Sequence, residues 1–125
     1  MVPDWMTFDG IPAAGGRTDY YSYDACRTPW RFSLDYLWNG NTKAQEWCTK
    51  ITNFASSIGA TSIVDGYELD GTPRGQYNNS AFVGGFAVGS MCNSQEILDD
   101  FTQRLKQLDS GGGNNQNFNL SLRKL

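Results

Sequence analysis

The sequence predicts an all-α fold built from αα-hairpins, with a small β-hairpin-like loop inserted between them. Three observations support this: apolar residues recur at helical spacing, Pro and Gly residues mark the ends of these stretches, and the links between stretches are short. The 125 residues suffice for one ordinary domain. No internal repeat is visible, which argues against a solenoid.

The first helix is predicted over residues 28–39. Thr28 suits the N-cap, Pro29 suits the first helical position, and Gly40 follows the end. An apolar stripe at i, i+4, i+7 and i+8 is formed by Trp30, Leu34, Leu37 and Trp38. Phe32 and Tyr36 lie off this stripe, so we expect a helix that sits deep or lines a pocket.

A second helix is predicted from about Thr42 to Gly59, where glycine supplies the stop. The link at 39–42 is short, so residues 28–59 should form an αα-hairpin. Residues 60–78 contain two Asp-Gly pairs and Pro73, which predict a small hairpin or a folded-back loop.

A third helix is predicted from Ala81 to Met91, capped by Asn79 or Ser80. Its many glycines weaken a helix, so we expect it to be an interior helix with close backbone neighbours. The segment 93–96 resembles a capping box, with Asn in the first position, and should open a fourth, half-exposed helix. A flexible loop at 109–117 and the start of a fifth helix at 119–125 complete the prediction.

Composition excludes several classes of function. The chain has no histidine, so it holds neither a Ser-His-Asp nor a Cys-His nucleophilic site. Its net charge is −3 without a basic run, which argues against nucleic acid as a partner. The three cysteines form no CxxC pair, so a zinc site is not expected; at least one thiol is free, and one disulfide is not excluded. No apolar run could span a membrane, and the N-terminus does not look like a signal peptide.

The richest candidate site is the stretch 20–31, which places Asp24 among tyrosines, a tryptophan and two arginines just before a helix. Rings that cover sugar faces and charged groups that bond hydroxyls suit a neutral, hydroxyl-rich substrate. The alternative is structural: aromatic residues in the core, and Asp24 paired only with Arg27 or Arg31. Acidic residues at 65, 68 and 70 hint at calcium, but they lack the EF-hand pattern.

The segment Tyr23-Asp-Ala-Cys-Arg-Thr-Pro-Trp-Arg31 resembles the C-terminal part of glycoside hydrolase family 8, a family of endoglucanases, lichenases, xylanases and chitosanases. Three further segments agree with this family in order and spacing: Val2-Pro-Asp-Trp5, Asn79-Ser-Ala-Phe82 and Asn119-Leu-Ser-Leu-Arg123. The resemblance covers essentially the whole chain. It implies that residues 1–125 are a C-terminal fragment of one (α/α)6 toroid, with the remainder of the catalytic domain as a partner.

The resemblance also implies a chemistry. It predicts inverting endo-hydrolysis of a β-1,4-linked glucan, with Asp24 as the general base, Tyr23 positioning the water, and Arg27 contacting the base or the substrate. No carboxylate here matches the family's Glu general acid, so the isolated chain should be nearly inactive. No cofactor or metal is implied, and the family suggests secretion. The alternative is a non-catalytic carbohydrate-binding or structural helical fragment; glucan, mixed-linkage glucan, xylan and chitosan all remain open as substrates.

Overall fold

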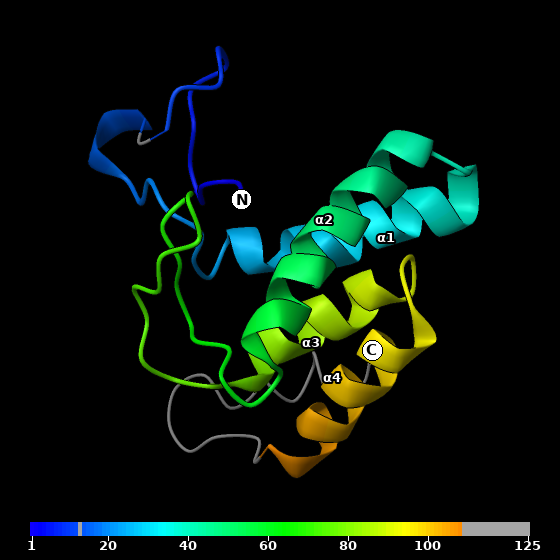
Figure 1. Ribbon diagram of the computed structural model, residues 1–125. Helices are drawn as coiled ribbons and strands as arrows, with labels where there is room; N and C mark the ends of the chain where they lie inside the picture. Colours follow the sequence, from blue (N-terminus) through cyan, green and yellow to red (C-terminus); the bar gives the residue numbers. More distant parts are fainter. Residues whose placement is uncertain (13, 109–125) are drawn as a thin grey trace.

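The computed structural model describes residues 1–12 and 14–108. In this part of the chain the fold is all-α and contains no regular strand (Figure 1). The helices are α1 (Thr28–Asn39), α2 (Thr42–Ile58), α3 (Ser80–Ser90) and α4 (Gln95–Gln107), with short 3₁₀ helices at Ala14–Gly16 and Ala25–Arg27. The predicted loop at 109–117 and the predicted helix at 119–125 lie outside the described residues.

Helix α1 begins differently from the prediction. Thr28 is not an N-cap, because its hydroxyl donates a hydrogen bond to the Ala25 carbonyl at 2.7 Å instead of accepting one from the helix. The 3₁₀ turn Ala25–Arg27 runs directly into the helix, and Pro29 occupies its first turn as expected. Gly40 ends the helix in the left-handed conformation, with φ of 69°.

The apolar stripe of α1 is not its buried face. Only Pro29 and Ser33 are buried in this helix, while Leu37 and Trp38 are 44% and 77% exposed. Ser33 contacts the neighbouring helix, donating to the Val88 carbonyl at 3.0 Å. In the described structure α1 therefore does not sit deep, and the alternative that it lines a pocket stays a prediction.

Helices α1 and α2 form the predicted αα-hairpin. The side chain of Asn41 caps α2 by accepting hydrogen bonds from the N–H groups of Lys43 and Ala44. Phe32 packs on Trp47 across the hairpin, with ring centroids 4.6 Å apart.

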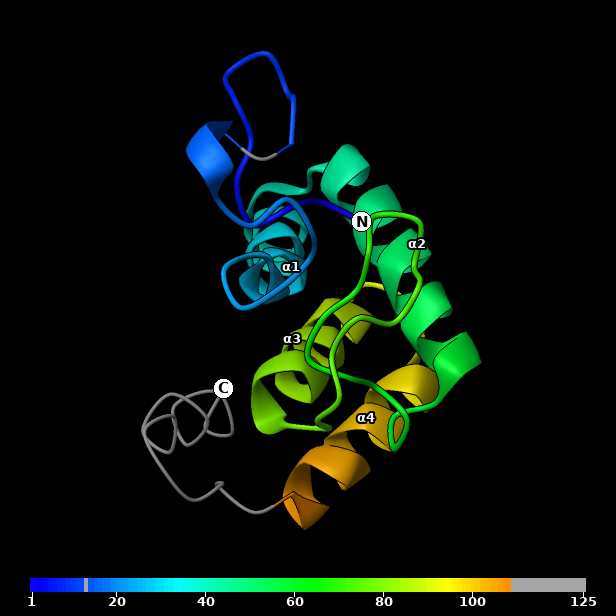
Figure 2. The same cartoon turned by 90° about the vertical axis from the view of Figure 1, so that its left-hand side faces the viewer.

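Helix α3 is the central element, and it contacts each of the other three helices. Figure 2 shows it lying between α1 and α4. The side chain of Asn79 caps it, and nearly all of its residues are buried. Its glycines permit the close approach that the sequence predicted: a Cβ on Gly85 would lie 2.4 Å from the Cys26 carbonyl oxygen, and one on Gly89 would lie 2.9 Å from the Pro29 Cβ.

Helix α4 packs one face on α3 and leaves the other exposed, as predicted. Phe101 is buried against Phe86, with ring centroids 6.1 Å apart. The cap is Ser94, one residue later than the predicted Asn93, and its hydroxyl accepts from the Ile97 N–H. The Asn93 amide instead donates to Thr52 and Asn53 on α2, so a tertiary contact decides which of two adjacent polar residues caps the helix.

The two long loops meet beside the helices, where the N-terminal segment and residues 60–79 lie next to each other (Figure 1). Tyr21 and Tyr67 exchange backbone hydrogen bonds of 2.9 and 3.0 Å, and both side chains are buried. Residues 66–75 fold back in a hairpin-like turn with a single bridge between Tyr67 and Pro73, so the predicted loop is present without regular strands.

All three cysteines are buried free thiols. Cys26 belongs to the turn before α1, Cys48 to α2, and Cys92 to the link between α3 and α4. The Cys92 sulfur lies 3.1 Å from the Ser33 hydroxyl. The three cysteines therefore act as small residues of the core.

Candidate functional site

Asp24 lies at the surface, immediately before the 3₁₀ turn that leads into α1. Its side chain is 49% exposed, so the carboxylate is open to solvent and to a ligand. The segment that carries it is pinned on one side by the Tyr21–Tyr67 backbone pair. On the other side the buried residues Ala25 and Cys26 anchor it to the core.

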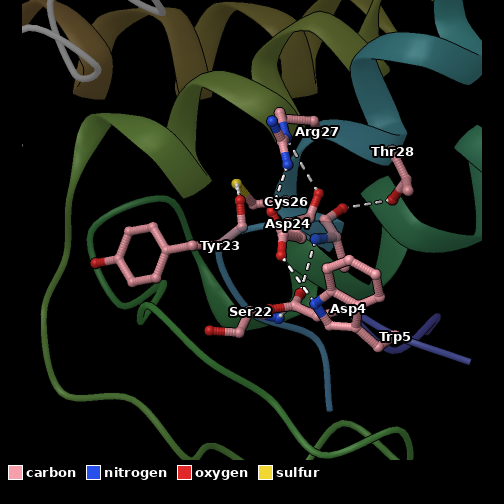
Figure 3. Close-up of polar contacts among 9 residues, drawn as sticks. Asp4, Trp5, Ser22, Tyr23, Asp24, Cys26, Arg27 and Thr28 are labelled. Carbon is pink, nitrogen blue, oxygen red and sulfur yellow. Dashed lines mark hydrogen bonds and ion pairs between the residues drawn. The ribbon is translucent and has the colours of Figure 1, made fainter. Parts of the chain in front are cut away.

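Asp4 fixes the backbone on both sides of Asp24. Its Oδ1 accepts a hydrogen bond from the Ser22 N–H at 2.8 Å and another from the Ala25 N–H at 2.7 Å (Figure 3). The Ala25 N–H lies at the start of the 3₁₀ turn, where it has no helical partner, so Asp4 acts as a cap supplied from a distant part of the sequence. The position of Asp24 is thus set by contacts that are remote in the chain.

Two donors hold the Asp24 carboxylate from different sides. The Arg27 Nη2 lies 2.5 Å from Oδ1, and the Trp5 indole N–H donates to Oδ2 at 3.2 Å (Figure 3). Arg27 also bonds the Asp24 carbonyl through Nε at 3.3 Å. The predicted ion pair between Asp24 and Arg27 is therefore present, and each oxygen of the carboxylate has a separate partner.

Tyr23 is adjacent to Asp24 in sequence, but its ring extends to the opposite side (Figure 3). Its hydroxyl donates to Asp65 Oδ2 at 2.8 Å and accepts from the Asn79 amide at 2.9 Å. Burial is the largest cause and the hydrogen bond to Asp65 the second, and together they raise the pKa of Tyr23 to about 12. The phenol is therefore protonated at neutral pH, and it links the 60–79 loop to the segment that carries Asp24.

Asp65 organises the loop on the Tyr23 side. Its Oδ1 accepts from the N–H groups of Gln76 and Tyr77 at 2.8 and 3.0 Å. Burial alone raises the pKa of Asp65, but the hydrogen bonds from Tyr77, Tyr23 and Gln76 outweigh it and leave the pKa below its ordinary value of 3.8.

These bonds lead to a pH-dependent prediction. Asp65→Ala should lower the free energy of unfolding by about 2 kcal/mol at pH 7. Because the folded-state pKa is lowered, the part of this stabilisation that depends on the ionised carboxylate is complete above the ordinary value of 3.8 and is lost as the pH falls through the folded-state pKa. Urea unfolding at neutral and acidic pH should show the gap between the two proteins narrowing in acid. Asp9→Ala, at an exposed position, should match the parent throughout; a constant gap for Asp65→Ala would contradict the prediction.

The other predicted candidates are placed apart from the carboxylate. The Arg31 guanidinium lies over the ring of Trp30, 4.8 Å from its centroid, so Arg27 alone is paired with Asp24 among the described arginines. Tyr21 is buried, with its ring stacked on Phe86, and it belongs to the core. Tyr20 carries the Arg74 guanidinium over its ring at 4.0 Å.

The acidic loop residues serve structure. Asp70 accepts from the Thr72 N–H at 2.9 Å, and Glu68 pairs with Arg74 at 3.0 Å. Across residues 1–12 and 14–108, no group of three acidic or cysteine side chains is placed to hold a metal ion. Among the helices of the same residues, none combines the length and the apolar character that a membrane crossing requires.

The residues that sequence reasoning missed are Asp4, Trp5 and Arg17. The Arg17 guanidinium lies 4.0 Å from the centroid of the Trp5 ring, and Trp5 in turn reaches Asp24. No local spacing links these residues to the 20–31 stretch. The only signal was the Asp4-Trp5 pair in one of the segments that resemble the family, and that pair did not indicate a role.

An accessible carboxylate beside a guanidinium and an indole can accept a proton and contact a hydroxyl-rich ligand. The class of protein is shown by comparison with known proteins. The model of glycosyl hydrolases family 8 matches residues 1–125, and the chain belongs to this family.

Individual relatives support the assignment. The chain is 37% identical over 113 residues to endoglucanase C of Ruminiclostridium cellulolyticum, covering 89% of this chain and 24% of that protein. It is 43% identical over 91 residues to endoglucanase A of Acetivibrio thermocellus, covering 73% and 19%. The chain thus spans about a quarter or less of the length of these curated relatives.

Solved structures share the fold. A β-1,3-1,4-glucanase from Paenibacillus sp. X4 matches with a TM-score of 0.75 and 28% identity, over 98% of this chain and 32% of that one. A mutant of Rex8A from Paenibacillus barcinonensis, in complex with an arabinofuranosyl-xylotetraose, matches with a TM-score of 0.77 and 20% identity, over 97% and 33%. The second likeness concerns the fold alone.

Proposed function

We propose that Asp24 is the general base of an inverting endo-hydrolase that cleaves β-1,4-linked glucan. The observation that carries the proposal is the accessible Asp24 carboxylate, bonded on one oxygen by Arg27 and on the other by Trp5. Membership of glycosyl hydrolases family 8 supports it, as do the two endoglucanases among the relatives.

In this mechanism Asp24 accepts a proton from a water molecule. The water oxygen forms a bond to the anomeric carbon, the bond from that carbon to the glycosidic oxygen breaks, and a carboxylic acid protonates the departing oxygen. An inverting enzyme keeps the two carboxyl groups roughly 6.5–9.5 Å apart so that the water fits between base and sugar. We assign the acid to the remainder of an (α/α)6 catalytic domain, of which residues 1–125 form the C-terminal part.

Arg27 and Tyr23 support the base in different ways. The Arg27 side chain is 39% exposed, and a guanidinium has more N–H donors than the two that bond Asp24, so it can also bond a sugar hydroxyl. Tyr23 is assigned to help position the attacking water, and the bonds to Asp65 and from Asn79 hold its protonated phenol in place. Secretion belongs to the same proposal, because a polymeric glucan is too large to enter a cell.

The stereochemistry of the product tests the proposal. The complete protein should release the α-anomer first from a soluble β-1,4-glucan, as followed by proton NMR before mutarotation. Early appearance of the β-anomer would contradict an inverting mechanism. Parallel digests of mixed-linkage glucan, xylan and chitosan would identify the preferred polymer. If β-1,4-glucan were hydrolysed more slowly than each of the other three polymers, the proposed substrate would be wrong.

A further inference from the structure

The Asp24 carboxylate is held by two donors of different kinds. Arg27 lies only three residues away and brings a positive charge to Oδ1. Trp5 comes from the N-terminal segment and brings a neutral N–H to Oδ2. A second neutral donor fixes the plane of a carboxylate without adding another charge beside it, whereas an ion pair on one oxygen leaves the group free to swing about that contact.

Trp5 is itself held in place. Its backbone N–H donates to the Thr18 carbonyl at 3.1 Å, and the N–H of the preceding Asp4 donates to the Tyr20 carbonyl at 2.8 Å. The Arg17 guanidinium covers the indole face at 4.0 Å, a cation–π contact. The side chain is nevertheless 42% exposed, so it is not a core residue whose position would follow from burial alone. Figure 3 shows its ring placed edge-on to the carboxylate.

The two residues of the Asp4-Trp5 pair act on Asp24 at different levels. Asp4 fixes the backbone through the Ser22 and Ala25 N–H groups. That leaves the rotation of the Asp24 side chain undetermined, and the Trp5 contact restrains this rotation. A general base must direct a lone pair at the water that it deprotonates, so the side-chain angle affects the rate directly.

We propose that Trp5 is a positioning residue for the general base: its indole N–H holds Oδ2 of Asp24 so that a remaining lone pair of that oxygen points at the attacking water. This inference rests on the proposed function of Asp24. The 3.2 Å contact from Trp5 is longer than the 2.5 Å contact from Arg27, so Oδ2 is the less strongly engaged oxygen and the one that takes the proton.

The sharpest test replaces Trp5 in the complete protein with 3-benzothienylalanine, in which sulfur takes the place of the indole N–H while the bicyclic ring is kept. Loss of one hydrogen bond to a charged group should lower kcat on soluble β-1,4-glucan about tenfold. KM should change less than about twofold, since the ring surface is unchanged. Trp5→Phe, which also keeps a ring under Arg17, should show at least the same loss in kcat.

The same unnatural residue at Trp38, which is 77% exposed on α1, serves as the matched control and should leave kcat unchanged. A further arm repeats the Trp5 replacement in Asp24→Asn, where it should add no loss to the residual hydrolysis. The positioning role alone would be overturned by either of two results. One is an unchanged kcat when Trp5 is replaced in the parent protein; the other is a loss of kcat in Asp24→Asn as large as the loss in the parent. Full activity of Asp24→Asn itself would instead overturn the proposed function of Asp24, and the role of Trp5 with it.

Discussion

Asp24→Asn in the complete protein is expected to lower kcat on a soluble β-1,4-glucan by about 10²–10⁴-fold, the usual contribution of a general base. Asparagine has nearly the same shape and keeps one oxygen that can accept from Arg27, so the backbone of the site should stay in place, although the amide NH2 cannot accept from Trp5. An amide does not take a proton from water near neutral pH. The loss should therefore fall on kcat, with KM within about twofold of the parent.

The control for this prediction is Asp99→Asn on the exposed side of α4, which removes a carboxylate away from the site and should leave kcat unchanged. Thermal unfolding of both variants, measured alongside activity, should stay close to that of the parent. Hydrolysis by Asp24→Asn at the parent rate would contradict the role as base. It would favour the alternative in which Asp24 only pairs with Arg27 and serves structure.

Gly85→Ala is expected to lower the free energy of unfolding by about 2 kcal/mol. Alanine favours a helix over glycine by about 1 kcal/mol, but here its methyl group would lie 2.4 Å from the Cys26 carbonyl oxygen. The obstacle is backbone, which no side-chain rotation removes, and forcing such a contact costs about 3 kcal/mol. Chemical denaturation of the purified protein measures the difference.

Gly89→Ala provides a graded comparison on the same helix. Its methyl group would meet the Pro29 Cβ at 2.9 Å and the Thr52 methyl at 3.2 Å. The Pro29 Cβ belongs to a rigid ring joined to the backbone, so relief requires a small shift of α1 against α3. Because 2.9 Å is a milder clash than the 2.4 Å at Gly85, the loss should be smaller than for Gly85→Ala, about 1 kcal/mol. Equal destabilisation by the two substitutions would show that the Cys26 carbonyl is not the decisive contact.

The helices were predictable where their ends depend on local chemistry. Pro29, Gly40 and Gly59 mark boundaries through backbone properties that no tertiary contact needs to supply, and the structure places α1 and α2 accordingly. The glycine content of α3 likewise predicted an interior helix. Prediction failed where two local solutions compete, as for Asn93 and Ser94, because a side chain on α2 decides between them.

The exposed stripe of α1 shows a different limit. Periodicity reports which side of a helix is apolar, but not which side its neighbours cover. Ser33 is buried because it bonds the Val88 carbonyl of α3, while Leu37 and Trp38 stay exposed. A small polar residue at a tight helix crossing gives no signal in a pattern of apolar residues.

The site itself was half predictable. Asp24 and Arg27 stand three residues apart before a helix, and local spacing alone suggested that they meet. The contributions of Asp4 and Trp5 depend on the N-terminal segment lying along residues 18–22, a pairing that no local pattern encodes. The Asp4-Trp5 pair belongs to a segment that resembles the family, but the atoms that it bonds follow only from the three-dimensional structure.

The buried cysteines allow local opening of the protein to be measured by chemical labelling of their thiols. Thiolates, not thiols, react with alkylating reagents, and burial raises the pKa of the Cys26 and Cys48 thiols to about 12. Alkylation near neutral pH therefore waits for the surrounding structure to separate. The rate of labelling at Cys26 would report the loosening of the segment that carries Asp24. The rate at Cys48 would report the separation of α2 from α1, because the Cys48 thiol donates a hydrogen bond to the Pro29 carbonyl of α1.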